Sequence, residues 1–428
     1  MRAITFEAPI PRYLLTLAAG ALSSELYVGP HACTRCREIA TPELPGPDWV
    51  RIRTRMGGIC GSDTNIVTLG ASPSASPFSS FPFVLGHENV GEIAELGPGV
   101  LGFEAGERVV VNPLLCCEPR GVTPPCAACA AGHHSRCAHF TDGTLAPGMF
   151  IGTTRGLGGS WGEWFVAHAS QLVRVHDAVP DAEAVLTEPL ACCVHAVHRV
   201  RPVVGQRVLV IGAGTMGLLQ VAALRAIAPG ASVTVLARHA FQAAHAKRLG
   251  ASRVVMARGD YLRELADAGE TRLLQPILGR PIGVGGFDAT YVCIGGTRGV
   301  EDALRFTTQG GAIVLLGAAN KRLNIAYVLK ESFGQLWDYA SEGWARRFFD
   351  NWRASLKWQR LAPYERFAAM IDRHWDGIAA YCKPENKVSL GFVEGLNNKI
   401  RVIQRRAYGL RDEEYLRLKV LTCMLPPI

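Results

Sequence analysis

The sequence predicts an α/β plus β protein in which a many-stranded β domain is followed by a doubly wound parallel sheet and then by a helical C-terminal tail. Up to about Arg201, glycine and proline separate short β-branched runs, a pattern typical of strands joined by long loops. From Gly205, apolar strands alternate with a glycine-rich turn and Ala/Leu-rich helices. From Asn320, apolar residues recur at helical spacing. We therefore expect domains at residues 1–200, 201–318 and 319–428.

Individual elements follow from the same patterns. In the β domain, Trp49–Arg53 and Glu107–Val111 are β-branched runs that predict strands. In the tail, Ile325, Leu329, Phe333 and Leu336 lie three or four residues apart, as on one face of a helix. The strands expected in the parallel sheet are Arg207–Ile211, Ser232–Leu236, Phe287–Cys293 and Ala312–Leu316.

Length and composition limit the class of protein. A chain of 428 residues is too long for one compact core, and 48% hydrophobic with 19% charged residues is ordinary for a globular protein. The N-terminus has no charged leader before an apolar run, and no stretch has the apolar length of a membrane helix. We therefore expect a cytoplasmic protein with no membrane partner. In such a reducing compartment, 13 cysteines indicate metal binding rather than disulfides.

The composition changes abruptly near Ala318. Of the net charge of +8, +7 falls on residues 319–428, which hold 19 Lys+Arg and 12 Asp+Glu. The same stretch has five of the eight tryptophans but only six of the 46 glycines. Such a shift marks a boundary between segments of different origin. A basic excess favours a nucleic-acid or interaction module, and the plain alternative is a solvated helical appendage.

A glycine-rich turn indicates a dinucleotide site. Gly212, Gly214 and Gly217, with Thr215 and Met216 between them, follow an apolar strand and precede the helix expected at Leu218–Ala226. In this context glycine permits the tight turn and the approach of backbone to a pyrophosphate, while the helix N-terminus attracts phosphate charge. The alternative is a glycine-rich turn without a ligand.

The end of the next strand bears on cofactor choice. The position that accepts the ribose hydroxyls of NAD usually holds an acid, but here the strand continues into Ala237 and Arg238. A cation in place of an acid favours the 2′-phosphate of NADP over NAD. The alternative is that Arg238 is a solvated surface residue.

Upstream motifs carry mixed metal ligands. Cys60 stands in GICGSD, His87 in GHE and Glu188 in EPLA. A thiolate, an imidazole and a carboxylate together suit Zn²⁺, and a catalytic zinc leaves one position open for water or substrate. Each residue alone could be structural: a buried thiol, a loop histidine and a charge at a helix start.

A second group of cysteines predicts a closed zinc site in a lobe at about residues 112–140. Cys126, Cys129 and Cys137 combine with Cys117, or with Cys116, to give four thiolates, the arrangement of a structural zinc. The alternative is a cluster of reduced thiols. Cys33 and Cys36 have no second pair nearby, and Cys192 and Cys193 lie on an apolar stretch expected to be helical, so both pairs are interpreted as structural.

In this order and at these intervals, the motifs GICGSD, GHE, EPLA and GAGTMG resemble the zinc-containing medium-chain dehydrogenases, closer to the polyol and glucose branch than to the liver-type alcohol dehydrogenases. The resemblance implies a GroES-like β domain followed by a Rossmann domain, and a homo-oligomer, although the altered C-terminal part counts against that assembly here. It also implies zinc ligands at Cys60, His87 and Glu188, with Glu88 as a carboxylate that coordinates in some members.

The resemblance further implies metal-assisted hydride transfer between an alcohol, polyol or sugar and NAD(P). Ser62 matches the hydroxyl that begins the proton relay, whereas Asn65 stands where many relatives have the next histidine of that relay. In the lobe, Thr123 occupies the family's usual first cysteine position, so Cys117 or Cys116 must substitute. A zinc-free quinone reductase would share the Rossmann domain but would have no use for these ligands.

The tail resembles something different. Residues Gly391–Ile400 and Arg405–Gly409 are similar to the C-terminal end of DDE-type transposases, a resemblance covering about residues 320–427. Glu394 matches the third catalytic acid, but the two aspartates that complete such a site are missing, and one carboxylate cannot hold paired metals. We expect a dehydrogenase whose C-terminal segment has been replaced, with impaired activity. Nucleic-acid binding through Lys399, Arg401, Arg405 and Arg406 is the rival interpretation.

Overall fold

The computed structural model describes residues 1–71, 73–316, 329, 333, 335–356 and 361–381. The chain divides into two compact units, Met1–Lys321 and Arg322–Ile428. The transposase-like motifs at residues 391–409, including Glu394, lie outside the described residues.

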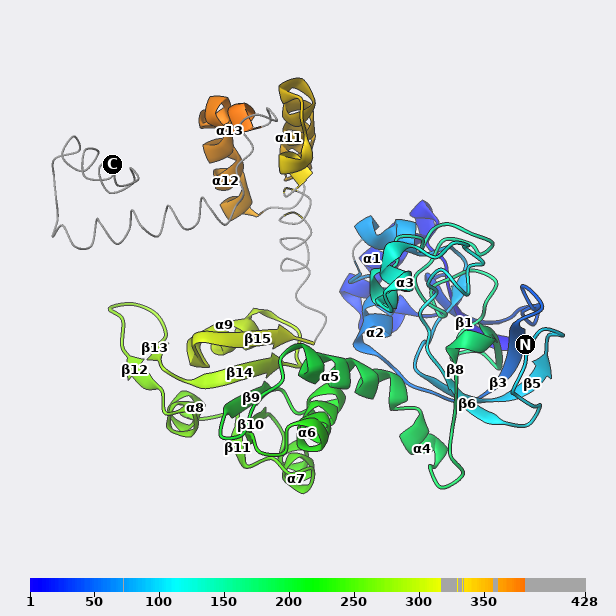
Figure 1. Cartoon of the computed structure of the whole chain (residues 1–428), viewed down its shortest axis with the longest axis horizontal. Helices are drawn as coiled ribbons and strands as arrows, with labels where there is room; N and C mark the ends of the chain where they lie inside the picture. The colour runs from blue at the N-terminus through cyan, green and yellow to red at the C-terminus, as the bar shows by residue number, and fades with distance from the viewer. Residues whose placement is uncertain (72, 317–328, 330–332, 334, 357–360, 382–428) are drawn as a thin grey trace, which may run out of the picture. The chain divides into compact units, whose positions relative to one another are not determined.

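The N-terminal part of the first unit contains two antiparallel sheets (Figure 1). One has the strand order β2-β1-β4 and the other has the order β7-β3-β5-β6-β8. In β3, Val50 and Ile52 are fully buried and pack with Ile93, Val109 and Phe165. Burial of these β-branched and aromatic side chains between sheet and loops is what the strand runs predicted. The strands are β1 (Arg2–Phe6), β2 (Thr34–Glu38), β3 (Trp49–Gly57), β4 (Phe83–Val84), β5 (Asn89–Leu96), β6 (Arg108–Val111), β7 (Trp164–His168) and β8 (Leu172–Arg174).

This part also carries helices in its long connections. The longest is α1 (Ile10–Leu22), inserted between β1 and β2 where the sequence was interpreted as strands and loops. Its leucine- and alanine-rich sequence favours a helix. The others are α2 (Gly61–Val67), α3 (Ala127–Ala130), α4 (Asp181–Ala184) and the 3-10 helices Ser24–Tyr27, Pro73–Phe78, His134–Arg136 and Ala169–Gln171.

The second part of this unit is built on a parallel sheet with the strand order β11-β10-β9-β14-β15. Four of its strands lie at the predicted runs, β15 beginning five residues earlier than expected, whereas β11 was not predicted. A hairpin of β12 and β13 stands apart from this sheet (Figure 1). The strands are β9 (Arg207–Ile211), β10 (Ser232–Ala237), β11 (Arg253–Met256), β12 (Arg272–Leu274), β13 (Ile282–Val284), β14 (Phe287–Val292) and β15 (Thr307–Leu315).

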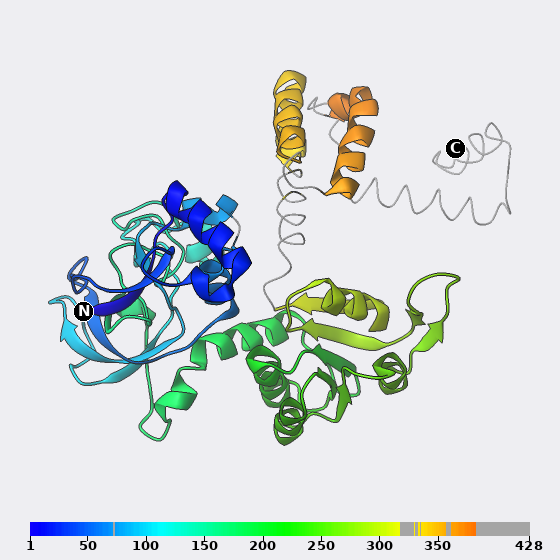
Figure 2. The same ribbon diagram turned by 180° about the vertical axis from the view of Figure 1, so that it is seen from behind.

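Helices cover both faces of the parallel sheet (Figures 1 and 2). Val208 and Val210 of β9 pack with side chains of α5, α6 and α7, whereas Leu209 and Ile211 pack with those of α8 and α9. A strand buried on both faces reads as a continuous apolar run, which explains the sequence of β9. The helices are α5 (Thr187–Arg199), α6 (Thr215–Ile227), α7 (Ala240–Arg248), α8 (Tyr261–Gly269) and α9 (Thr297–Phe306).

The C-terminal unit is helical where it is described. Phe349 and Trp352 of α11 stack on one another and pack with Phe333 and Trp375. These aromatic side chains form a core separate from those of the first unit. The elements are the 3-10 helix Gln335–Asp338, α11 (Glu342–Leu356), α12 (Ala362–Arg373) and α13 (Trp375–Tyr381).

Among the described residues, no helix combines the length and the apolar character needed to cross a bilayer.

Candidate functional site

Cys60 lies at the start of α2, where a hydrogen bond between its backbone and the Asp63 side chain fixes its position. Its N–H donates to Oδ2 of Asp63 at 3.0 Å, which caps the helix. Just before it, the Gly58 N–H donates to the backbone oxygen of Glu88 at 3.0 Å. A Cβ at Gly58 would come within 2.0 Å of Oε2 of Glu88. Glycine is therefore needed here for the two loops to approach.

His87 and Glu88 lie between β4 and β5. Gly86 precedes them with a φ of +95°, a conformation that favours glycine, and a Cβ there would meet Ser160 and Trp161. On the other side, Asn89 is buried and donates to the His87 backbone oxygen and to the Val111 oxygen, each at 3.0 Å. The backbone that carries the two side chains is thus fixed from both ends.

These loops bring three of the predicted ligands together. Cys60 Sγ, a ring nitrogen of His87 and a carboxylate oxygen of Glu88 all lie within 4.8 Å of one another. Ligand atoms around one zinc lie about 3–4 Å apart for bonds of about 2.0–2.3 Å. The donor set therefore suits a zinc ion, and three protein donors leave the fourth tetrahedral position for another ligand.

Asp63, which the sequence interpretation did not assign a role, orients His87. Its side chain is 1% exposed, and Oδ1 lies 3.3 Å from His87 Nδ1. Burial lowers the pKa of His87, but hydrogen bonds with Asp63 and Cys60 outweigh it and raise the pKa to about 10. A carboxylate on Nδ1 leaves Nε2 for a metal, as in many histidine sites. The signal was present in the sequence as the capping-box spacing between Cys60 and Asp63.

Glu188 lies at the first turn of α5 and is not part of the group of three. Its Oε1 accepts a hydrogen bond from Cys192 Sγ, one helical turn later, at 3.7 Å. Burial raises the pKa of both Glu188 and Glu88, while the nearby His87 lowers them. Of the two carboxylates that the sequence left open, the structure groups Glu88 with Cys60 and His87.

Ser62 lies in the same turn of α2 as Cys60 and Asp63, with an exposed side chain. Asn65 is also exposed, one turn further along the helix.

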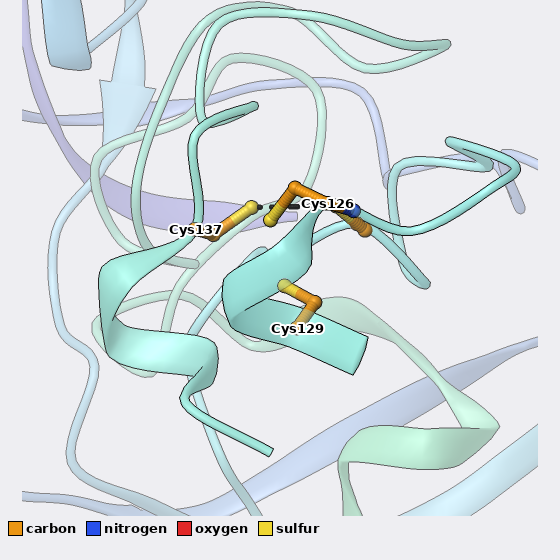
Figure 3. Close-up of side chains that lie close together, drawn as sticks. Cys126, Cys129 and Cys137 are labelled. Atoms are coloured by element: carbon orange, nitrogen blue, oxygen red, sulfur yellow. Dashed lines mark hydrogen bonds between the residues drawn. The ribbon is translucent and has the colours of Figure 1, made fainter. Parts of the chain in front are cut away.

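A second cluster lies in the lobe, where Cys117, Cys126, Cys129 and Cys137 place their sulfur atoms within 4.8 Å of one another. Cys126 immediately precedes the short helix α3 and Cys129 lies within it, and their side chains point toward that of Cys137 (Figure 3). Cys117 Sγ lies 3.5 Å from Cys137 Sγ, close to the about 3.8 Å expected between two sulfurs on one zinc. Cys116 is buried but does not belong to this group.

Backbone groups of the lobe also stabilise thiolates. The Cys126 N–H donates to Cys117 Sγ at 3.4 Å, and the His139 N–H donates to Cys137 Sγ at 3.3 Å. Hydrogen bonds from the Ala138 and Cys129 backbone lower the pKa of Cys126 to about 6, whereas burial raises the pKa of Cys137 to about 12. The four sulfurs fit a zinc ion, whose binding would displace the remaining thiol protons.

Arg120 supports this lobe from inside. Its side chain is fully buried, and its guanidinium donates to the backbone oxygens of five loop residues; no carboxylate of the described residues pairs with it. Burial lowers the pKa of Arg120, while the nearby Cys137 raises it. A zinc ion with four thiolates has a net charge of −2, so a buried cation beside it is electrostatically favourable. The accepting residues are Leu115, Asp142, Leu145, Ala146 and Gly148.

The remaining cysteine pairs do not form a metal group in the described part of the chain. Cys33 and Cys193 are buried, whereas Cys36 and Cys192 are exposed, and all four are free thiols.

The glycine-rich turn joins β9 to α6, and each glycine has a different local reason. Gly212 has a φ of +96°, which permits the turn. A Cβ at Gly217 would lie 1.8 Å from the Gly212 oxygen, so only glycine allows this helix to pack on the strand. Gly214, before Thr215 and Met216, faces open space at the N-terminus of α6. That space and the free N–H groups of the helix fit a pyrophosphate.

Arg238 follows β10 and is exposed, while Ala237 is fully buried. The backbone N–H groups of Arg238 and His239 both donate to Gln242 Oε1, at 3.3 and 3.2 Å. The side chain of Arg238 forms no ion pair with the described residues. It is thus available to a ligand at this edge of the sheet.

Comparison with known families divides the chain in the same order. Residues 46–177 match the alcohol dehydrogenase GroES-like domain, and residues 215–335 match the zinc-binding dehydrogenase family. Residues 305–420 match a transposase family. The last two matches overlap, so they do not locate the junction to a single residue.

Whole-protein relatives agree. Sorbitol dehydrogenase of Bacillus subtilis is 28% identical over 300 residues, which is 68% of this chain and 76% of that protein. L-threonine 3-dehydrogenase of Mesorhizobium japonicum is 31% identical, over 66% of this chain and 72% of that protein. Among solved structures, 2R,3R-butanediol dehydrogenase from Bacillus subtilis superposes with a TM-score of 0.52 at 25% identity, over 67% of this chain and 75% of its own. A protein of Sinorhizobium meliloti 1021 assigned to the zinc-binding dehydrogenases and bound to NADP gives a TM-score of 0.54 at 26% identity, over 67% and 74%. The chain therefore belongs, with a GroES-like domain followed by a Rossmann-type domain, to the zinc-dependent alcohol and polyol dehydrogenases, and carries a transposase segment after them.

Proposed function

We propose that residues 1–318 form an NADP-preferring, two-zinc dehydrogenase for a secondary alcohol, polyol or sugar, and that replacement of the C-terminal segment impairs it. The proposed domains are residues 1–200, 201–318 and 319–428. The observation that supports this most is the convergence of Cys60, His87 and Glu88 in a chain that also has the glycine turn at Gly212–Gly217. We place the protein in the cytoplasm, since its thiols need a reducing compartment to bind zinc.

In this proposal Cys60, His87 and Glu88 hold one zinc, and Glu188 is a nearby carboxylate able to exchange with Glu88. When bound, zinc supplies a Lewis acid for the substrate hydroxyl, and the nicotinamide supplies a hydride acceptor. Asp63 keeps the His87 ring in one tautomer. Ser62 Oγ, exposed beside the ligands, receives the substrate proton and releases it directly to solvent, because Asn65 cannot relay a proton. The four lobe cysteines hold the second, structural zinc.

Cofactor preference is proposed to depend on Arg238. Its guanidinium would bind the 2′-phosphate of NADP, and the buried Ala237 offers no carboxylate to repel it. We expect NADPH to bind about tenfold more tightly than NADH, and Arg238→Ala to remove the difference, a change of about 1.4 kcal/mol. Fluorescence titration with both cofactors measures this, with Arg263→Ala, an exposed arginine of α8, as the control. Equal affinities in the natural chain would contradict the preference.

We propose that dehydrogenase activity is impaired because the parallel sheet is incomplete at one edge. Among the described residues β15 is the last strand, so its outer edge has no neighbour in that part of the chain. In relatives this fold continues into a further strand and a return to the catalytic domain. An incomplete wall around the nicotinamide end loosens the positions of the reacting atoms, and hydride transfer is steeply sensitive to such loosening.

The decisive experiment compares turnover of the natural chain with a repaired chain. In the repaired chain an intact relative's C-terminal segment replaces residues 319–428, and both are assayed with zinc, both cofactors and a panel of alcohols, polyols and sugars. We expect turnover at least 100-fold higher in the repaired chain. Comparable turnover would show that the tail completes the enzyme, and no turnover in a repaired, folded, zinc-loaded chain would refute the dehydrogenase proposal.

A second candidate function is nucleic-acid binding by the tail, favoured by its transposase match and its charge of +7. Strand transfer is not proposed, because the segment supplies a single candidate acid. Salt-dependent binding of DNA by the full chain would support this function, and its absence at low salt would remove it.

A further inference from the structure

The helix α1 presents its isoleucine and leucine side chains outward. Ile10, Leu14, Leu15, Leu17 and Leu22 are exposed by 76, 58, 56, 42 and 87%. The residues that α1 buries are instead Thr16 and Gly20. A helix on a protein surface normally buries its leucines and exposes its polar residues, so this arrangement is reversed. With Leu26 and Val28 of the following segment, which are also exposed, these five residues form what we name the α1 apolar face.

The inner side of α1 is fixed to the domain, so the helix cannot simply rotate to hide its leucines. Thr16 Oγ1 accepts a hydrogen bond from the Cys33 N–H at 3.0 Å. Arg12 forms an ion pair with Glu7 at the end of β1. A Cβ at Gly20 would lie 2.3 Å from the ring of Tyr27, so this glycine allows the helix and the chain that follows it to pack closely. Turning the helix would break all three contacts.

The size of the α1 apolar face matches one side of a protein interface. If a fully exposed residue of this kind has an area of about 190 Å², the exposed fractions of its seven residues amount to roughly 800 Å². This is the most that one partner could cover, and it equals the area that each partner contributes to a standard interface. Monomers rarely expose a larger contiguous apolar patch than a few hundred Å².

The chemistry of the face favours a protein partner over a membrane surface. Arg12, the one charged residue of α1, is already ion-paired with Glu7, so no basic residue of the helix is left for anionic headgroups. Ile10, Leu14, Leu17 and Ala21 follow the four-three-four spacing of a helix-pair seam, and the exposed Ala18 and Ala21 allow close approach. We infer that the α1 apolar face packs against the same face of a second copy of this chain around a two-fold axis. This inference does not depend on the proposed function.

The test is the mass of the full chain in solution, measured by light scattering after size exclusion from about 1 to 100 μM. The natural chain is expected to be dimeric, and Leu14→Glu/Leu17→Glu to weaken the dimer at least 100-fold. Glutamate is a good helix former at these exposed positions, so the variant should keep its fold and zinc content. A monomeric natural chain, or a folded variant that dimerises as before, would overturn the inference.

Two controls separate this surface from others. Leu101→Glu/Val204→Glu removes apolar side chains that are 85% exposed elsewhere, and Ile277→Glu/Leu278→Glu alters the tip of the β12–β13 hairpin. Both should leave the dimer intact, and loss of the dimer only in the hairpin variant would assign the interface there instead.

Cross-linking tests the geometry. Ala18→Cys, near the middle of α1, should form a disulfide between two chains under mild oxidation, in excess of that formed by the parent chain. A disulfide within one chain would show that another part of the same chain covers the face. Flotation of monomers with phosphatidylcholine vesicles, if Leu14→Glu/Leu17→Glu abolishes it, would show that a membrane covers the face. Either result would overturn the inference.

Discussion

The two clusters that we propose to hold zinc in the dehydrogenase part differ in their donor types and in how the chain brings those donors together. Cys60, His87 and Glu88 are three different donors, brought together by two loops that meet at Gly58. The lobe has four identical donors, of which one immediately precedes a single turn of helix and another lies within it. Three protein donors would leave a bound zinc ion one coordination position for another molecule, whereas four thiolates would fill a tetrahedron. Loss of a ligand should therefore affect chemistry in one cluster and folding in the other.

The largest expected effect is the loss of a lobe cysteine. Cys129→Ser removes one of four thiolates and should destabilise the protein by on the order of 5 kcal/mol, a fraction of the about 10–16 kcal/mol with which structural sites hold zinc. Cys60→Ser, the matched change in the first cluster, should lower the zinc count from two to one and alter stability by less than about 1 kcal/mol. Elemental analysis and thermal unfolding measure both. Equal destabilisation by the two variants would contradict the proposed division into a structural and a catalytic cluster.

Next in size is the change Arg120→Met. It removes the donors to five backbone oxygens inside the lobe and should cost about 3–5 kcal/mol of stability. Zinc should also leave the lobe faster in the presence of a chelator. Arg155→Met, at an exposed position outside the lobe, is the control and should change stability by less than about 0.5 kcal/mol. A small effect of Arg120→Met would mean that the lobe does not depend on the buried cation.

The smallest expected effect is that of Asp63→Asn. The amide oxygen can still accept from the Cys60 N–H, so the cap of α2 should largely survive. The charge that holds His87 is lost, and zinc affinity at the first cluster should fall about 10–100-fold while the lobe keeps its zinc. Chelator competition resolves the two sites, with Asp177→Asn as an exposed control. Unchanged affinity would show that Asp63 only caps the helix.

The fold was more predictable from sequence than the site. β9 lies between two layers of helices and is buried on both faces, so its sequence is an unbroken apolar run that predicts a central strand. The helix α1 was missed because its leucines point outward and its buried residues are Thr16 and Gly20, which leaves no ordinary amphipathic pattern.

Within the site, the sequence indicated which residue types could bind a metal, but it did not show which of the alternative residues lie together. Glu88 and Glu188 are equally suitable carboxylates by chemistry, and only the approach of the loops at Gly58 puts Glu88 beside Cys60. Cys116 and Cys117 are adjacent, and the direction of a single side chain separates them. Such choices depend on three-dimensional contacts, which spacing along the chain does not contain. The proposed roles of these residues stay predictions until zinc and cofactor binding are measured.

The aromatic core of the C-terminal unit has a consequence for how such a chain can arise. Its buried side chains, from Leu329 to Ala379, pack with one another. A segment that brings along the residues that hide its own apolar surface can be moved from one gene to another without compensating changes in the gene that receives it.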